Sequence, residues 1–405
     1  MKYIEGGVCA AKGFLAAARH CGVKSKNTDK KDVAIIYSET ECAAAAVYTK
    51  NAVKAAPLHI TKEHLKDGRA RAILANSGNA NACAPMGEEN ALKCCEAAAK
   101  ALGVSTDSVL VASTGVIGQT LPADVIISGI PQIAAELGPE GSNSAASAIM
   151  TTDTVKKEYA VEFELGGKIV RLGGIAKGSG MIHPNMGTML CFLTTDCAIS
   201  SEMIGKALLE TVKISFNRIS VDGDTSTNDM CVLMANGKAG NAEITEENGD
   251  YEMFLEALAE VAVTLARKMA SDGEGASHLI TCTVRGADSE ENAETLSKSV
   301  ISSTLTKAAI FGADANWGRI LCAMGYSGVQ FDPDEVSVAF ESAAGRIDVC
   351  RDGRGLSFDE DKAKKILTEH DVIIDIEMRS GPCECTCWGC DLTYEYVRIN
   401  GDYRT

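Results

Sequence analysis

The segment best suited to chemistry is KGSGMIHPNMGTMLCFLTTD, residues 177–196, near the middle of the chain. It starts as a glycine-rich loop and turns at Thr188 into an apolar run, residues 189–193. If the peptide bond between Gly187 and Thr188 were cut, one residue would carry a hydroxyl nucleophile and a free α-amine able to act as its base. A Gly-Thr pair by itself more often marks a tight turn into a core strand. The rest of the sequence has to decide between these two interpretations.

The common catalytic motifs are absent from the sequence. It contains no G-x-x-x-x-G-K-[ST] loop, no strand-borne G-x-G-x-x-G and no G-x-S-x-G elbow. The six histidines never fall at the spacing of metal ligands. The Gly-Thr junction is therefore the best candidate for a reactive centre.

The sixteen cysteines are numerous for a chain of 405 residues. Many occupy positions that suit a small buried apolar residue, and in a reducing compartment we expect them to be free thiols. Examples are Cys9, Cys42, Cys191, Cys231 and Cys322.

Four further cysteines follow the pattern C-x-C-x-C-x-x-C, which could hold zinc or an iron–sulfur cluster. They are Cys383, Cys385, Cys387 and Cys390. In a strand the first three would share one face instead of surrounding an ion. We therefore favour core thiols here, and we expect no metal.

Composition and charge restrict the class of protein. With 405 residues, 46% of them apolar, the chain can build two domain-sized halves or one large layered core. Its net charge of −16 argues against nucleic acid and anionic membranes as partners, because both require basic patches. No stretch reaches the ~18 apolar residues of a membrane span, and residues 1–13 lack the apolar core of a signal peptide. We expect a cytoplasmic protein.

Strand-like and helix-like segments alternate along the chain, which favours an α/β layered fold. We predict helices at 88–102, 142–150, 201–216, 251–270, 290–307 and 359–369. We predict strands at 33–38, 43–49, 71–75, 108–112, 159–165, 168–172, 230–235, 279–284, 336–340, 346–350, 372–378 and 392–399. The first two strands are expected to pair with each other. No Pro/Ser-rich linker separates autonomous halves.

Motifs spread along the whole chain resemble those of the glutamate N-acetyltransferase family of arginine biosynthesis, also called ornithine acetyltransferases. They include GGVCAAKGF at 6–14, NSGNANAC at 76–83, ASTGVIG at 112–118, MTTDT at 150–154, AKGSGMIHPNMGTML at 176–190, DGDTSTND at 222–229, SDGEGA at 271–276 and ADANWGRI at 313–320. The combination is far more specific than any single motif.

This resemblance implies an α-β-β-α sandwich and a precursor that cuts itself between Gly187 and Thr188. The products would be an α chain, residues 1–187, and a β chain, residues 188–405, of 405 − 187 = 218 residues. Together they would form one interleaved core, assembled as α2β2. The family often has alanine before the cut, and glycine should ease the strained peptide that the cut requires.

The resemblance also implies the residues of the site. Thr188 would take an acetyl group from N2-acetyl-L-ornithine and pass it to L-glutamate, while Thr114 and Gly115 would form the oxyanion hole. The implied substrate-binding residues are Thr151, Lys177, Thr188, Glu274, Asn400 and Thr405. Lys177 suits a carboxylate and Glu274 an ammonium group, as a zwitterionic amino acid requires. The choice among Thr151, Thr152 and Thr154 stays open.

No cofactor is expected, and whether acetyl-CoA serves as a co-substrate is left open. The main alternative is an N-terminal-threonine amidohydrolase or aminopeptidase, in which water replaces glutamate as the acceptor. Two other hypotheses are a metal-sensing module built on Cys383–Cys390 and a relative that is never processed.

Overall fold

The computed structural model describes residues 1–24, 30–183 and 189–402. Within these residues, nine strands form one mixed sheet. The order across the sheet is β1 (Lys2–Ile4), β6 (Lys157–Leu165), β7 (Lys168–Lys177), β8 (Leu190–Thr195), β10 (Met230–Ala235), β3 (Val33–Tyr48), β4 (Arg69–Asn79) and β5 (Val109–Val116), and β2 (Phe14–Arg19) also pairs with β3. Strands β8 and β10, which follow residue 187, therefore lie side by side between strands that precede it.

The long strand β3 allows the sheet to fold into two layers. Its first part pairs with β2 and its last part with β10, and its register with β4 shifts between Tyr37 and Cys42. The prediction of two separate strands that pair with each other was wrong. Residues 39–41 (Glu-Thr-Glu) are exposed but contain no glycine or proline to close a turn, so the chain stays extended through them.

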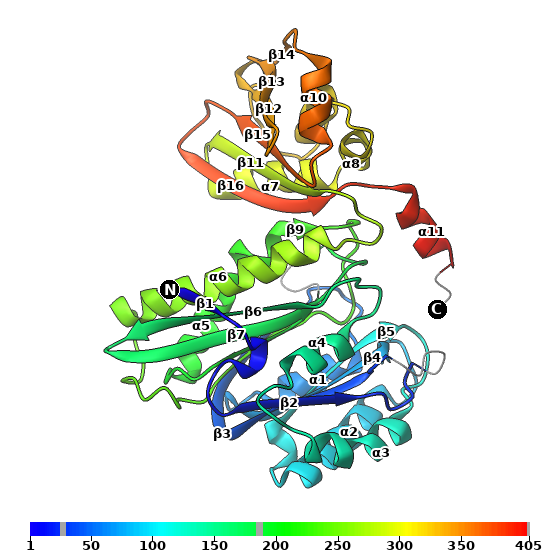
Figure 1. The fold of residues 1–405 in the computed structure, drawn as a ribbon, viewed down its shortest axis with the longest axis vertical. Coiled ribbons are helices and arrows are strands. Elements are labelled where there is room, and N and C mark those ends of the chain that lie inside the picture. Colours follow the sequence, from blue (N-terminus) through cyan, green and yellow to red (C-terminus); the bar gives the residue numbers. More distant parts are fainter. Residues whose placement is uncertain (25–29, 184–188, 403–405) are drawn as a thin grey trace.

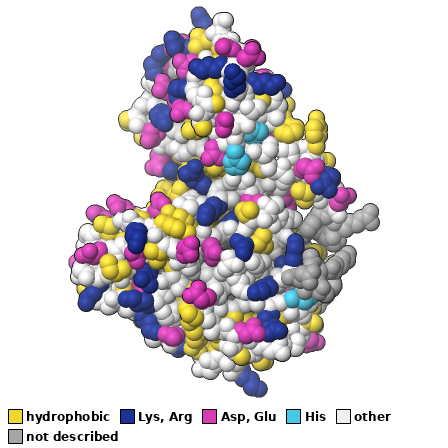
Figure 2. Space-filling model, in the orientation of Figure 1, with side chains coloured by type: hydrophobic (Ala, Val, Ile, Leu, Met, Phe, Trp, Pro, Cys, Tyr) yellow, Lys and Arg dark blue, Asp and Glu magenta, His cyan; other side chains and the backbone are white. Residues whose placement is uncertain are grey.

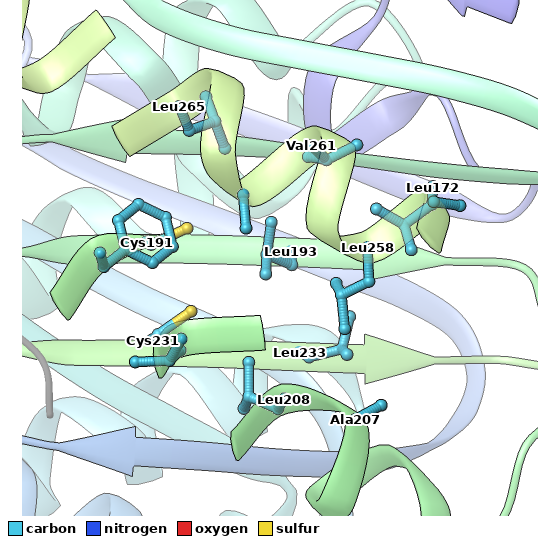
Figure 3. Packing of buried hydrophobic residues seen from close by; sticks show 14 of the residues in the cluster. Leu172, Cys191, Leu193, Ala207, Leu208, Cys231, Leu233, Leu258, Val261 and Leu265 are labelled. Carbon is cyan, nitrogen blue, oxygen red and sulfur yellow. The ribbon is translucent and has the colours of Figure 1, made fainter. Parts of the chain in front are cut away.

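Helices cover both outer faces of the folded sheet. On one side α5 (Ser201–Ile214) and α6 (Gly249–Ser271) pack against β7, β8 and β10. Figure 3 shows Leu258, Val261 and Leu265 of α6 lying over this face. On the other side α1 (Ala56–His64), α2 (Gly87–Leu102) and α3 (Ala123–Ala135) pack against β3, β4 and β5.

A third cluster lies between the two sheet layers, together with α4 (Ser142–Ile149). Strand β8 shows how the layers are built, because Cys191 and Leu193 face the α5–α6 side whereas Leu190 and Phe192 face the inner cluster. Such a strand is apolar on both faces, as its sequence indicates. The order of layers is α-β-β-α, and the predicted fold class is confirmed.

The part of the chain after residue 278, joined by a short strand at residues 219–220, builds a second sheet with its own core (Figure 1). Among the described residues its order is β14 (Arg354–Gly355), β13 (Gly345–Arg351), β12 (Ser337–Ser342), β15 (Asp371–Glu377), β11 (Leu279–Ala287), β16 (Cys383–Cys390) and β9 (Ile219–Ser220). Its helices are α7 (Glu290–Ser302), α8 (Thr304–Phe311), α9 (Trp317–Gly325) and α10 (Glu360–Leu367). Figure 2 shows acidic and basic side chains interspersed over both bodies, with the surface hollowed on one side where they meet.

Two predicted elements near the C-terminus were wrong. The predicted helix 290–307 is two helices, because Ser303 has an extended backbone and its side chain caps α8 by accepting a hydrogen bond from the Thr306 N–H. The predicted strand 392–399 is instead the helix α11 (Tyr394–Asp402). Tyr394 and Val397 are 82% and 67% exposed, whereas Tyr396 and Ile399 are half-buried, so the alternation does not mark one fully buried face.

All sixteen cysteines are free thiols, as predicted. Cys385 and Cys387 lie in the core of the second sheet with Cys282, and Cys390 is buried in the α6 cluster. Cys322 was expected to be buried, but it lies on the exposed side of the short helix α9. In the part of the chain that the structure describes, no group of three or more His, Cys, Asp or Glu side chains is placed to hold a metal ion. Over the same residues, no helix combines the length and hydropathy needed to cross a membrane.

Candidate active site

A pocket of about 330 Å³ gathers most of the predicted site residues. They come from segments scattered along the sequence: Thr114, Gly115, Thr151, Lys177, Glu274 and Asn400. Three other predicted residues, Gly187, Thr188 and Thr405, lie outside the described residues.

Thr114 and Gly115 lie at the end of β5, which continues to Val116 instead of stopping at the predicted residue 112. Gly115 has φ +130°, and a Cβ there would lie 2.4 Å from the carbonyl carbon of Gly78 on β4. The β4–β5 register also shifts at this point. Only glycine allows the two backbones to approach so closely, so this local structure fixes how Thr114 and Gly115 face the pocket.

Lys177 is the last residue of β7, and its side chain is buried at the base of the pocket. Its Nζ donates a hydrogen bond to Thr114 Oγ1 at 3.2 Å. Because an ammonium group can only donate, the Thr114 oxygen accepts this bond and its own hydrogen is left for a ligand. Burial lowers the pKa of Lys177, although the nearby carboxylates of Asp153, Asp229 and Glu274 oppose that shift.

A buried ionic network lies beneath the pocket. Lys157 Nζ is 2.7 Å from Asp153 Oδ1 and 2.5 Å from Asp272 Oδ2, with all three side chains almost fully buried. Burial raises the pKa of Asp153, but the positive charges of Lys177 and Lys157 outweigh it and bring the pKa to about 2. The network thus keeps its charges compensated within the protein interior.

The same carboxylates fix the backbone of two loops. Asp153 accepts hydrogen bonds from the N–H groups of Thr151 (3.0 Å) and Gly178 (2.7 Å). Asp272 accepts from the N–H of Thr154 at 3.1 Å, and its own carbonyl accepts from Ser179 Oγ at 2.7 Å. The segments that carry Thr151, Lys177 and Glu274 are therefore all hydrogen-bonded to the same two buried aspartates or to their neighbours.

Glu274 and Asn400 close another side of the pocket. The Glu274 N–H donates to the Ser179 carbonyl at 2.9 Å. A Cβ at Gly180 would lie 2.3 Å from a Glu274 carboxylate oxygen, so glycine is what lets the carboxylate lie against this loop. Asn400 Nδ2 donates to Glu274 Oε2 at 2.7 Å, which ties α11 to the pocket.

The structure distinguishes between the neighbouring threonines. Thr151 and Thr152 both line the pocket, whereas Thr154 uses its N–H and its hydroxyl to bind Asp272. Only the first two can meet a ligand in this pocket.

Sequence reasoning missed the contribution of Ser226, Thr227 and Asn228, which also line the pocket. Asn228 Nδ2 donates to the carbonyls of Ala80 (2.6 Å) and Ser113 (2.8 Å), so it holds the β5 end that carries Thr114. The sequence feature that could have indicated these three residues is the polar loop DGDTSTND, which comes directly before the buried strand β10.

The described chain resumes at Met189, which is buried and whose carbonyl accepts from the Met230 N–H at 2.8 Å. The next residue, Leu190, is paired with Lys177 across β7 and β8. The first strand residue of the expected β chain therefore lies beside the lysine of the pocket.

The arrangement of layers and the pocket at the strand ends define the class of protein: an α-β-β-α sandwich of the ornithine acetyltransferase type. Residues 15–405 match the ArgJ family. The chain belongs to this family.

Relatives of known name agree with this assignment. The arginine biosynthesis bifunctional protein ArgJ of Symbiobacterium thermophilum is 49% identical over 406 residues, covering 100% of both chains. ArgJ 1 of Clostridium acetobutylicum is 51% identical, over 97% of this chain and 96% of its own. The crystal structure of ArgJ from Bacillus halodurans is 43% identical, with a TM-score of 0.50, and covers 52% of this chain and 98% of its own.

Proposed function

We propose that this chain moves an acetyl group from N2-acetyl-L-ornithine to L-glutamate through an ester on Thr188. As a member of the ArgJ family the chain is an acetyltransferase of arginine biosynthesis, and the proposal adds the donor, the acceptor and the residue. The observation that carries it is one pocket that brings together Thr114, Gly115, Thr151, Lys177, Glu274 and Asn400.

Self-cleavage comes first in this proposal. The Thr188 hydroxyl adds to the Gly187 carbonyl and the C–N bond breaks, giving an ester. Water then hydrolyses that ester, which leaves a carboxylate on Gly187 and a free α-amine on Thr188. The solved Bacillus halodurans chain supports this step, because the matched share implies about 215 residues (0.52 × 405 ÷ 0.98). That length is close to the 218 expected for residues 188–405.

Acyl transfer then takes two half-reactions. The Thr188 hydroxyl, deprotonated by its own α-amine, attacks the acetyl carbonyl of acetylornithine, and ornithine leaves as the amine after taking up that proton. The amine of glutamate attacks the resulting ester, forms N-acetylglutamate and returns the proton to Thr188. In each half-reaction the Thr114 hydroxyl and the Gly115 N–H face the developing negative oxygen, and losing one such donor typically costs about 10²–10³ in rate.

The charges of the pocket fit an amino-acid substrate. Lys177 pairs with a substrate carboxylate and Glu274 with an ammonium group, while Thr151 and Asn400 supply neutral hydrogen bonds. In this proposal Thr405 is the last of the substrate-binding residues. The enzyme needs no cofactor and works in the cytoplasm as an α2β2 assembly, and acetyl-CoA is the candidate second donor.

The hydrolase alternative uses the same nucleophile with water as the acceptor. Membership of the ArgJ family does not favour it. Consumption of acetylornithine without formation of acetylglutamate would instead favour the hydrolase.

The test is Thr188→Ala, followed by intact-mass measurement and an assay of acetylglutamate formed from acetylornithine and glutamate. The variant should stay a single chain and form no product. Thr188→Ser is the matched control, since serine keeps a hydroxyl and should still cut and transfer. Cleavage of Thr188→Ala at 187/188 would disprove the mechanism.

A further inference from the structure

Met181 lies on the wall of the pocket that holds Lys177 and Glu274, and its backbone conformation is unusual. Its φ is +55°, in the left-handed region that glycine, asparagine and aspartate adopt far more readily than a methionine does. Its side chain is 43% exposed. Both features cost stability, and strain of this kind at a pocket points to a functional constraint.

Hydrophobic packing does not account for this methionine. The next residue, Ile182, is buried in the core that α6 covers, whereas Met181 belongs to none of the hydrophobic clusters that the described residues form. Among the described residues of the pocket wall, Ile117 and Met181 are the large apolar side chains, and Ile117 packs on a small cluster of alanines. Met181 is therefore the apolar part of the wall that is left for a ligand.

The carboxylate of Asp222 holds the backbone of Met181 in this conformation. Asp222 Oδ2 accepts a hydrogen bond from the Met181 N–H at 2.6 Å, and Oδ1 accepts one from the Ile182 N–H at 3.0 Å. The Val221 N–H donates in turn to the Ile182 carbonyl at 2.7 Å. Because hydrogen bonds to a charged group are stronger than those between neutral groups, they can offset the strain of the positive φ.

The residue before Met181 places this methionine next to Glu274. Gly180 lies so close to the Glu274 carboxylate that a Cβ would come within 2.3 Å of it. The Glu274 N–H is also bonded to the Ser179 carbonyl, as described above. Asp222 thus fixes Met181 beside the carboxylate that receives an ammonium group of the substrate in the proposed function.

We propose that Met181 is a specificity-determining residue whose side chain packs on the methylene groups of the acetyl donor, and that Asp222 is its positioning residue. This inference rests on the proposed function, in which Lys177 binds the carboxylate of the donor and Glu274 binds its side-chain ammonium group. Since the protein fixes the distance between these two partners, an apolar wall beside Glu274 selects the number of methylene groups between the charged ends. A methionine side chain suits such a contact, because it is apolar and adaptable.

The experiment measures kcat/KM for three donors with L-glutamate as the acceptor, using enzyme whose cleavage has been checked by intact mass. The donors are N2-acetyl-L-ornithine, N2-acetyl-L-lysine, which is one methylene longer, and N2-acetyl-L-2,4-diaminobutyrate, which is one methylene shorter. The test variant is Met181→Ala. The matched control is Met86→Ala, because Met86 also has a φ of +55° and is 55% exposed but does not line the pocket.

We expect Met181→Ala to lower the preference for acetylornithine over acetyllysine about tenfold, because one methylene in an apolar contact is worth about tenfold or more in kcat/KM. The preference over the shorter donor should fall as well, since the contact with the third methylene is lost. Met181→Leu keeps an apolar side chain and should retain most of both preferences. Met86→Ala should retain both in full.

A double-mutant cycle tests the role of Asp222. Asp222→Asn keeps one acceptor oxygen and should lower the preference for acetylornithine over acetyllysine about threefold. The same change should have no effect on that preference in the Met181→Ala background, because Asp222 acts through Met181. A loss of stability alone would lower kcat/KM for every donor by the same factor and would not change the preferences.

The specificity role of Met181 is overturned if Met181→Ala keeps the preferences of the wild type. The positioning role of Asp222 is overturned if Asp222→Asn changes them equally in both backgrounds. A wild type that transfers nothing from acetylornithine would instead count against the proposed function. In that case calorimetric titration with free L-ornithine, L-lysine and L-2,4-diaminobutyrate measures the selectivity of the pocket directly, and equal selectivity in wild type and Met181→Ala would again overturn the role of Met181.

Discussion

Lys177 at the end of β7 and Thr114 at the end of β5 are joined by a hydrogen bond of 3.2 Å, although four strands lie between β7 and β5 in the order of the sheet. The contact is possible because the sheet folds over on itself through β3, which brings two distant strand ends to the same pocket. The pocket is thus a product of the layered fold.

Replacing Lys177 should test its charge separately from its bulk. Lys177→Met should lower kcat/KM by about 10²–10³-fold, because a charged donor to Thr114 and to the substrate is lost. Burial lowers the pKa of Lys177 below its ordinary 10.5, so the activity of the wild type should fall on the alkaline side before an exposed lysine would titrate. Lys177→Arg should retain some activity without this alkaline fall, because arginine stays charged. An unchanged pH profile in Lys177→Arg would contradict the role of the ammonium group.

The buried network should make stability depend on pH through Asp153. Its folded-state pKa of about 2 lies below the ordinary 3.8, so it contributes stability above pH 3.8 that is lost as the pH falls toward 2. The pKa difference corresponds to about 2 kcal/mol. Asp153→Asn removes one of the two carboxylates that pair with the buried Lys157, and it should cost about 3 kcal/mol at neutral pH.

Melting temperatures at pH 7 and pH 3 check this. The difference in melting temperature between wild type and Asp153→Asn should narrow at pH 3, while the exposed Asp361→Asn control should melt like the wild type at both pH values. A gap that is the same at both pH values would show that the carboxylate charge is not what stabilises the loops.

Two glycines with positive φ offer a matched pair. Gly115→Ala places a Cβ 2.4 Å from the Gly78 carbonyl carbon, whereas Gly118→Ala, at φ +84°, meets nothing within 4 Å. Gly118→Ala should cost about 1 kcal/mol from backbone strain alone. Gly115→Ala should cost clearly more and should also lower kcat/KM, because Thr114 must move with the strand end. Equal melting temperatures for the two variants would refute the close approach of the two backbones.

The C-terminal helix should act on substrate binding and not on self-cleavage. Deleting residues 400–405 removes the Asn400 hydrogen bond to Glu274, and KM should rise at least about tenfold while the precursor is still cut. Deleting only residues 403–405 keeps Asn400 and separates its effect from that of Thr405. Unchanged kinetics in the longer deletion would show that α11 takes no part in binding.

The four C-terminal cysteines should hold no metal. Elemental analysis of the purified protein should find less than one metal ion per chain, because Cys385 and Cys387 pack in the core with Cys282. Cys383→Ala, at a half-buried position, should leave acetyl transfer unchanged. A stoichiometric metal that disappears in Cys383→Ala would overturn this prediction.

The sequence by itself determined the fold class, most helices and strands, and the identity of the family. Apolar runs such as β8 and β10, buried on both faces, are set by local composition, and the helix ends carry their own signals, such as Gly103 at φ +68° after α2. Local patterns of this kind need no knowledge of distant residues.

Tertiary structure alone decided how the site is assembled. Only the folding of the sheet through β3 brings Lys177 to Thr114, and only packing shows that Asn228 holds the strand end and that Asp153, Lys157 and Asp272 form the base of the loops. The last segment failed as a strand for the same reason, since its alternating side chains had no sheet to face. Contacts between residues far apart in the chain depend on where the whole backbone goes, and no local pattern records that path.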